Sequence, residues 1–147
     1  MSQVLSIDIP TLTRYLETHV TGFIGPITLD KFPGGQSNPT FKVTAQSGLY
    51  VLRSQPAGKL LKSAHAVDRE YQVLDALKGS NVPVSKVFHL CTDLAITGAM
   101  FYLMEFCDGN VFWSASLAEI ETNALRSEMY NAMNEALVAL HSVDINT

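Results

Sequence analysis

The stretch "YVLRSQPAGKLLKSAHAVDREYQVLDAL", residues 50–77, decides the fold of this 147-residue chain. It begins with the alternating side chains of a strand that ends at Arg53, and after a loop it continues as a helix that carries Glu70. The apolar side chains of that helix recur at spacings of four, three and three and should pack on a sheet: Val67, Tyr71, Leu74 and Leu77. Glu70 lies at the margin of this apolar face. Since an acid there needs a cation, we expect Arg53 and Glu70 to meet.

Two interpretations of this pair remain open from the sequence. In the first, the pair is half-buried and Arg53 keeps N–H groups for a phosphate, so that removing one partner costs roughly 3–5 kcal/mol by stranding the other. In the second, it is a surface ion pair that contributes less than about 1 kcal/mol. Only the first makes Arg53 part of a binding site.

On the N-terminal side of this stretch, the pattern predicts one helix and then strands. Residues 10–20 form the helix, because Leu12, Leu16 and Val20 recur at helical spacing behind Pro10. Residues 27–53 alternate as strands and are broken by "FPGGQSNPT" and "AQSG", which supply turn geometry. We therefore expect a three-stranded meander before the stretch.

On the C-terminal side, two more strands and a long helix follow. The helix of the opening stretch should run from Ser63, as N-cap, to about Lys78, where Gly79 ends it. Strands are expected at residues 84–90 and 99–106, around the connection "TDLAITG". After the turn at residues 108–109, an apolar face from Leu125 to Leu140 predicts a helix that closes near His141.

Composition and charge exclude several classes of function. A net charge of -4 offers no basic surface for nucleic acid, and no apolar run reaches the roughly 18–20 residues that span a membrane. The first ten residues do not resemble a secretion signal, so we expect a cytoplasmic protein with Cys91 and Cys107 reduced. The four histidines lack metal-site spacing, so no metal-ligating residue is predicted.

Two loops could contact a ligand through backbone groups. In "FPGGQSNPT", Gly34 and Gly35 let the backbone approach an anion, and Ser37 and Asn38 add donors; the alternative is an ordinary hairpin turn. In "FYLMEFCDG", residues 101–109, a strand ends with backbone groups at an edge, where the adenine ring finds matching partners; the alternative is an edge strand that enters a turn.

The order of these features resembles the N-terminal lobe of the protein-kinase-like phosphotransferases. The segments "FPGGQSNPTFKV", "YVLRSQPAGKLLKSAHAVDREYQVLDAL", "VPVSKVFHLC" and "FYLMEFCDGNVF" resemble the aminoglycoside phosphotransferase (choline kinase-like) family. They are most similar to the phosphotransferase-like domain found with acyl-CoA dehydrogenases. The resemblance covers about residues 27–144.

This resemblance implies an α+β fold. Residues 1–104 would form a kinase-like N-terminal nucleotide-binding lobe, a five-stranded antiparallel sheet with an αC-type helix. Residues 105–110 would be the hinge, and residues 111–147 the start of a truncated helical C-terminal lobe.

The resemblance also implies a set of residues that bind ATP. The glycine loop would lie over the triphosphate: Gly34, Gly35, Gln36, Ser37 and Asn38. Arg53 would replace the strand lysine that steadies the α and β phosphates, with Glu70 as its helix partner. Met104 would be the gatekeeper, and the Glu105 carbonyl and Cys107 amide would meet the adenine edge.

Relatives in this family carry a catalytic aspartate in an "HGD" loop and a metal-binding aspartate after it. Residues 141–144 precede that loop, so we predict no catalytic residue, and the ligands of Mg are not in this chain. Without them phosphoryl transfer lacks a base and charge neutralisation, so we expect the 147 residues alone to be inactive.

The expected function is thus the ATP-binding lobe of a small-molecule phosphotransferase, which when complete transfers the γ-phosphate to a hydroxyl. The alternative is a non-catalytic binding or oligomerisation module derived from such a lobe. The last helix exposes an apolar face that needs cover. We expect it to fold back on the sheet, to swap, or to form a homodimer through Leu125, Met129, Met133 and Leu140.

Overall fold

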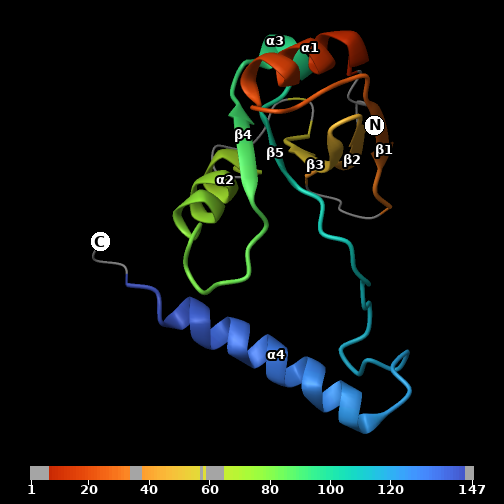
Figure 1. Ribbon diagram of the computed structural model, residues 1–147, viewed down its shortest axis with the longest axis vertical. Helices are drawn as coiled ribbons and strands as arrows, with labels where there is room; N and C mark the ends of the chain where they lie inside the picture. Colours follow the sequence, from red (N-terminus) through yellow and green to blue (C-terminus); the bar gives the residue numbers. More distant parts are fainter. Residues whose placement is uncertain (1–6, 34–37, 57, 59–64, 145–147) are drawn as a thin grey trace. The chain divides into compact units, whose positions relative to one another are not determined.

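A computed structural model describes residues 7–33, 38–56, 58 and 65–144 (Figure 1). The elements are, in order, α1 (Ile9–His19), β1 (Thr28–Lys31), β2 (Thr40–Ala45), β3 (Gly48–Ser54), α2 (Val67–Ala76), β4 (Val87–Cys91), α3 (Leu94–Thr97), β5 (Phe101–Glu105) and α4 (Asn123–His141). This is the predicted order with one addition. The predicted connection "TDLAITG" contains the one-turn helix α3, which Asp93 caps by accepting from the Ala95 amide at 2.9 Å and which the left-handed Gly98 ends.

The five strands form one antiparallel sheet in the order β1-β2-β3-β5-β4, which confirms the predicted fold class. Its register pairs Arg53 with Thr40 on one side and with Tyr102 on the other. Because side chains alternate along a strand, these three residues share one face of the sheet with Met104. Leu52 and its partner in β5 point to the opposite face.

That opposite face carries the larger core, to which α1 contributes. Leu12 and Leu16 of α1 are fully buried in one cluster with Leu52 and Leu103 of the two central strands. The predicted helix at residues 10–20 is therefore correct, and it begins slightly earlier because Asp8 caps it, accepting from the Thr11 amide at 2.9 Å.

Helix α2 packs on the face that carries Arg53. Val67 is fully buried there with Tyr102 and Val87, and Tyr71 and Leu74 pack around them. The predicted helix of residues 63–78 is too long at both ends. Ser63 lies outside the described residues, and α2 begins only at Val67.

Local backbone conformation explains both corrections. His65 has φ +62°, in the left-handed region, so no right-handed helix can run through it. At the other end, Ser80 closes a turn by donating its amide to the Leu77 carbonyl at 3.0 Å, beside the left-handed Gly79.

The chain forms two compact units, Met1–Ala76 with Ser85–Phe106, and Leu77–Val84 with Cys107–Thr147. In the second unit Thr122 caps α4, accepting from the Leu125 amide at 3.2 Å, and the Arg126 Nε–H donates to the Leu117 carbonyl at 3.0 Å. No residue within α4 is buried. Over the described ranges, no helix combines the length and the apolar character that crossing a membrane requires.

Candidate functional site

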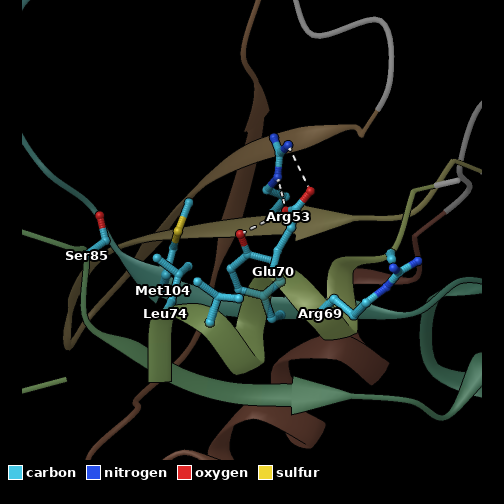
Figure 2. Close-up of a pocket in the computed structure, with 9 residues that line it drawn as sticks. Arg53, Arg69, Glu70, Leu74, Ser85 and Met104 are labelled. Carbon is cyan, nitrogen blue, oxygen red and sulfur yellow. Dashed lines mark hydrogen bonds and ion pairs between the residues drawn. The ribbon is translucent and has the colours of Figure 1, made fainter. Parts of the chain in front are cut away.

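Arg53 of β3 and Glu70 of α2 meet on one face of the sheet, within the first unit (Figure 2). The Arg53 Nε–H donates to Glu70 Oε2 at 2.6 Å and Nη2–H donates to Oε1 at 3.3 Å, a two-pronged geometry. The predicted pairing of these two residues is confirmed. Their side chains are 31% and 35% exposed, so the pair is half-buried, as in the first of the two interpretations.

Three neighbours complete the hydrogen bonding of this pair. The Tyr102 hydroxyl donates to Glu70 Oε2 at 3.2 Å, and the Asn38 amide nitrogen donates to Oε1 at 2.9 Å. On the other side, Arg53 Nη1–H donates to the Thr40 hydroxyl at 3.1 Å. Asn38 was predicted to donate to phosphate, but here its amide nitrogen binds Glu70. The pair is therefore held by groups from β2, β5 and the segment before β2.

These contacts keep the pair charged at neutral pH. Burial acts to raise the pKa of the Glu70 carboxyl, but hydrogen bonds from Arg53, Tyr102 and Asn38 outweigh it and lower that pKa. The hydrogen bond to Glu70 in turn raises the pKa of Arg53. Burial, with the charge of Glu70, raises the pKa of Tyr102 to about 12, so its hydroxyl stays a donor.

A pocket of about 750 Å³ lies against the pair, between α2 and the sheet. It is lined by Arg53, Ala66, Arg69, Glu70, Val73, Leu74, Ser85, Tyr102 and Met104. Figure 2 shows Met104 and Leu74 together at one end, with Arg53 and Arg69 toward the other. Met104, the predicted gatekeeper, thus lies with Leu74 at an apolar end of the pocket, and the guanidinium groups lie toward the other end.

The predicted adenine edge lies at the end of β5. The expectation that this is an edge strand is wrong, because β3 and β4 pair with β5 on its two sides. The Glu105 amide donates to the Lys86 carbonyl at 2.8 Å, and the Glu105 side chain accepts from the Lys86 amide at 3.3 Å. Cys107 is exposed and follows the strand. The roles of the Glu105 carbonyl and the Cys107 amide in binding adenine stay predictions.

Two aromatic rings and a lysine beside this edge were not predicted. The Phe32 and Phe106 rings are nearly parallel, at 8°, with centroids 6.5 Å apart, and Lys42 Nζ lies 4.9 Å from the Phe106 centroid. A flat ring could stack on either phenyl group. The register explains this placement but is not visible in the sequence: the Phe32 amide donates to the Thr40 carbonyl at 3.0 Å, which places Phe32 on the same face as Arg53.

The remaining predicted residues lie outside the described part of the chain. These are Gly34, Gly35, Gln36 and Ser37 of the glycine loop, whose phosphate contacts stay a prediction. Across the residues that are described, no group of three or more potential metal ligands is present. A guanidinium such as that of Arg53 is chemically suited to pair with an anion.

Comparison with known proteins shows the family to which this chain belongs. The model of the "Phosphotransferase enzyme family" matches residues 28–147. The chain belongs to this family. A crystal structure of a "putative aminoglycoside phosphotransferase" from Ralstonia eutropha JMP134 superposes with a TM-score of 0.79 at 42% identity, over 93% of this chain and 39% of that one. The kinase-like α+β fold is therefore shared.

Curated relatives extend the likeness to much longer proteins. The chain is 46% identical to the "Probable acyl-CoA dehydrogenase IBR3" of Arabidopsis thaliana, over 95% of the chain and 18% of that protein. It is 42% identical to the acyl-CoA dehydrogenase family member 10 of Mus musculus, over 97% of the chain and 13% of that protein. The chain thus spans less than a fifth of the length of these relatives.

Proposed function

We propose that this chain is the ATP-binding lobe of a small-molecule phosphotransferase. The observation that carries the proposal is the half-buried contact of Arg53 with Glu70, at 2.6 Å, in a phosphotransferase-family fold. In protein kinases a cation on the third strand and an acid on the neighbouring helix must pair before the phosphates of ATP are held. Arg53 of β3 and Glu70 of α2 occupy equivalent places.

The chemistry of Arg53 fits a phosphate group. A guanidinium has five N–H donors, and three of them are engaged by Glu70 and Thr40. The other two would bind phosphate oxygens, while Glu70 keeps the side chain oriented. Because an arginine stays charged at all physiological pH values, this contact needs no proton transfer.

The adenine base of ATP would bind on the side of Met104 that faces away from Arg53. Main-chain groups of Glu105 and Cys107 would meet its edge, and Phe32 or Phe106 would stack on its face. ATP would arrive with Mg, whose ligands we propose lie outside this chain. The 147 residues alone would then bind nucleotide without transferring phosphate to a hydroxyl, in the cytoplasm.

Calorimetric titration with Mg-ATP tests the proposal. The chain should bind, and Arg53→Ala should weaken binding at least about tenfold, since a charge-assisted contact is lost. Arg14→Ala is the matched control, because Arg14 is an exposed arginine of α1 in the same unit, and it should bind like the wild type. Absence of binding by the wild-type chain would leave the non-catalytic module as the better account.

A further inference from the structure

Asn38 joins the Arg53–Glu70 pair to a residue outside the pocket, His65. The Asn38 amide nitrogen donates to Glu70 Oε1 at 2.9 Å, and its amide oxygen lies 3.0 Å from Nδ1 of His65. Asn38 is only 4% exposed. A buried amide that is bound at both ends is held in one orientation.

The chemistry of the side chains decides which group donates in the contacts of Asn38 with Glu70 and with His65. An ionised carboxylate only accepts hydrogen bonds, so the amide must turn its NH₂ group toward Glu70. The amide oxygen then faces His65, and the imidazole Nδ1 must carry the proton that this oxygen accepts. Glu70 thereby sets the direction in which the Asn38 amide points, and the Nδ1–H of His65 supports that direction by donating to the amide oxygen.

His65 is itself held in an uncommon conformation. Its φ of +62° is rare for a residue other than glycine, although asparagine, aspartate and histidine adopt it more often than most. Its carbonyl accepts the Gln55 side-chain amide at 3.0 Å and the amide of Val67, the first residue of α2, at 2.9 Å. These two contacts connect His65 to the segment after β3 and to the start of α2.

Thr40 closes a ring of hydrogen bonds around the pair. Its hydroxyl donates to the Asn38 carbonyl at 3.1 Å and accepts from Arg53 Nη1 at 3.1 Å. Asn38 therefore reaches the guanidinium by two routes, through Glu70 and through Thr40. A ring of this kind resists rotation of any one member, because each rotation breaks two bonds.

We propose that Asn38 and His65 are positioning residues, which orient the Glu70 carboxylate and through it the Arg53 guanidinium for an anionic ligand. The orienting role stands on the contacts alone, whereas its effect on nucleotide affinity rests on the proposed function. Asn38 would act through Glu70 and need not touch the phosphates. His65 would act on Glu70 only through its contact with Asn38.

The test compares His65→Asn with His65→Gly in the full chain. Both replacements tolerate a positive φ, but only asparagine keeps an N–H donor close to the position of the imidazole Nδ1. The readout is hydrogen exchange of the Arg53 Nε–H by NMR, because its bond to Glu70 slows that exchange. The exposed Arg14 serves as the internal reference.

We expect slow exchange at Arg53 in the wild type and in His65→Asn, and exchange faster by at least about fivefold in His65→Gly. Equal exchange in all three folded proteins would overturn the proposal. Should the glycine variant not fold, His65→Asp replaces it, since aspartate has the shape of asparagine but at neutral pH only accepts. In His65→Asp the Asn38 amide should turn its NH₂ group toward position 65 and away from Glu70. If the Arg53 Nε–H then exchanged no faster than in His65→Asn, the positioning role of His65 would be refuted.

Calorimetry with Mg-ATP on the same variants separates this inference from the proposed function. Affinity should fall about tenfold in His65→Gly and stay within about twofold in His65→Asn. A wild-type chain that binds no nucleotide would remove the proposed function. The exchange rates at Arg53 would still decide whether Asn38 and His65 orient the pair.

Discussion

The carboxylate of Glu70 accepts hydrogen bonds from three residues, Arg53, Asn38 and Tyr102. Each donor comes from a different part of the sheet or its loops, and Glu70 comes from α2. A single side chain thus joins the helix to three places on one face of the sheet. Loss of this charge should therefore affect both stability and the orientation of Arg53.

Glu70→Gln tests the contribution of that charge to stability. At neutral pH we expect the free energy of unfolding to fall by on the order of 1 kcal/mol. This is well below the roughly 3–5 kcal/mol of a fully buried pair, because this pair is partly solvated and glutamine still accepts a hydrogen bond. The pKa of Glu70 is lowered in the fold, so its stabilisation is complete above the ordinary value of 4.5 and is lost as the pH falls through the folded pKa. Urea unfolding from about pH 7 to about pH 3 should show the two proteins converge. A difference that stayed constant with pH would contradict this account.

His89 gives stability a second dependence on pH, near neutrality. Burial, and then the neighbouring His19, lower the pKa of His89 below its ordinary 6.5, and its Nε2 lies 2.9 Å from the Tyr15 hydroxyl. The unfolded chain then takes up a proton at a higher pH than the folded one. Stability should be full above about pH 6.5 and decline as the pH falls toward the folded pKa.

The variant His89→Gln removes the titrating group and keeps an amide that can bond to Tyr15. Its free energy of unfolding should change less than that of the wild type between about pH 7 and about pH 5. Thermal or urea unfolding at several pH values measures this. Parallel curves for the two proteins would show that His89 does not titrate differently in the fold.

At the scale of elements, α1 is bound to the sheet by its buried leucines. Leu16 is fully buried, so Leu16→Ala should lower the free energy of unfolding by about 2–5 kcal/mol. Val73→Ala on α2 is the control, because Val73 is 58% exposed, and its change should stay within about 0.5 kcal/mol. Similar losses in the two variants, measured by urea unfolding, would mean that α1 is not part of the core.

The elements show how far local sequence patterns determine the structure. Alternation and helical spacing were enough to predict five strands, α1, α2 and α4, because each pattern reflects the face that its own element buries. The start of α2 could not be predicted, since it depends on the left-handed φ of His65. The helix α3 was missed because four residues are too few to show a period.

The same distinction applies to the site. The contact of Arg53 with Glu70 was predictable because the two residues lie 17 positions apart on consecutive elements and an acid at the margin of an apolar face needs a cation. Two other contacts were not predictable: the hydrogen bond of Asn38 to Glu70 and the stacking of Phe32 with Phe106. Their partners lie 32 and 74 residues apart, and no local pattern specifies the register of such distant segments.

At the scale of the whole molecule, α4 raises the question of self-association. Leu125, Met133 and Leu140 are 45%, 61% and 45% exposed, so the proposed homodimer would cover this face together with Met129. Light scattering should then give about twice the 16.1 kDa of one chain. Met133→Glu should restore the single-chain mass, whereas Ser127→Glu, on the opposite side of α4 from this face, should not. A wild-type chain of single mass at all concentrations would exclude the dimer.

The most direct test of the central claim is an NMR titration of the arginine Nε–H signals with Mg-ATP. If Arg53, oriented by Glu70, binds the phosphates, the Arg53 signal should shift and saturate with the same midpoint that calorimetry gives, while the Arg14 signal stays in place. Saturable binding that leaves Arg53 unmoved and shifts other arginines would contradict the account.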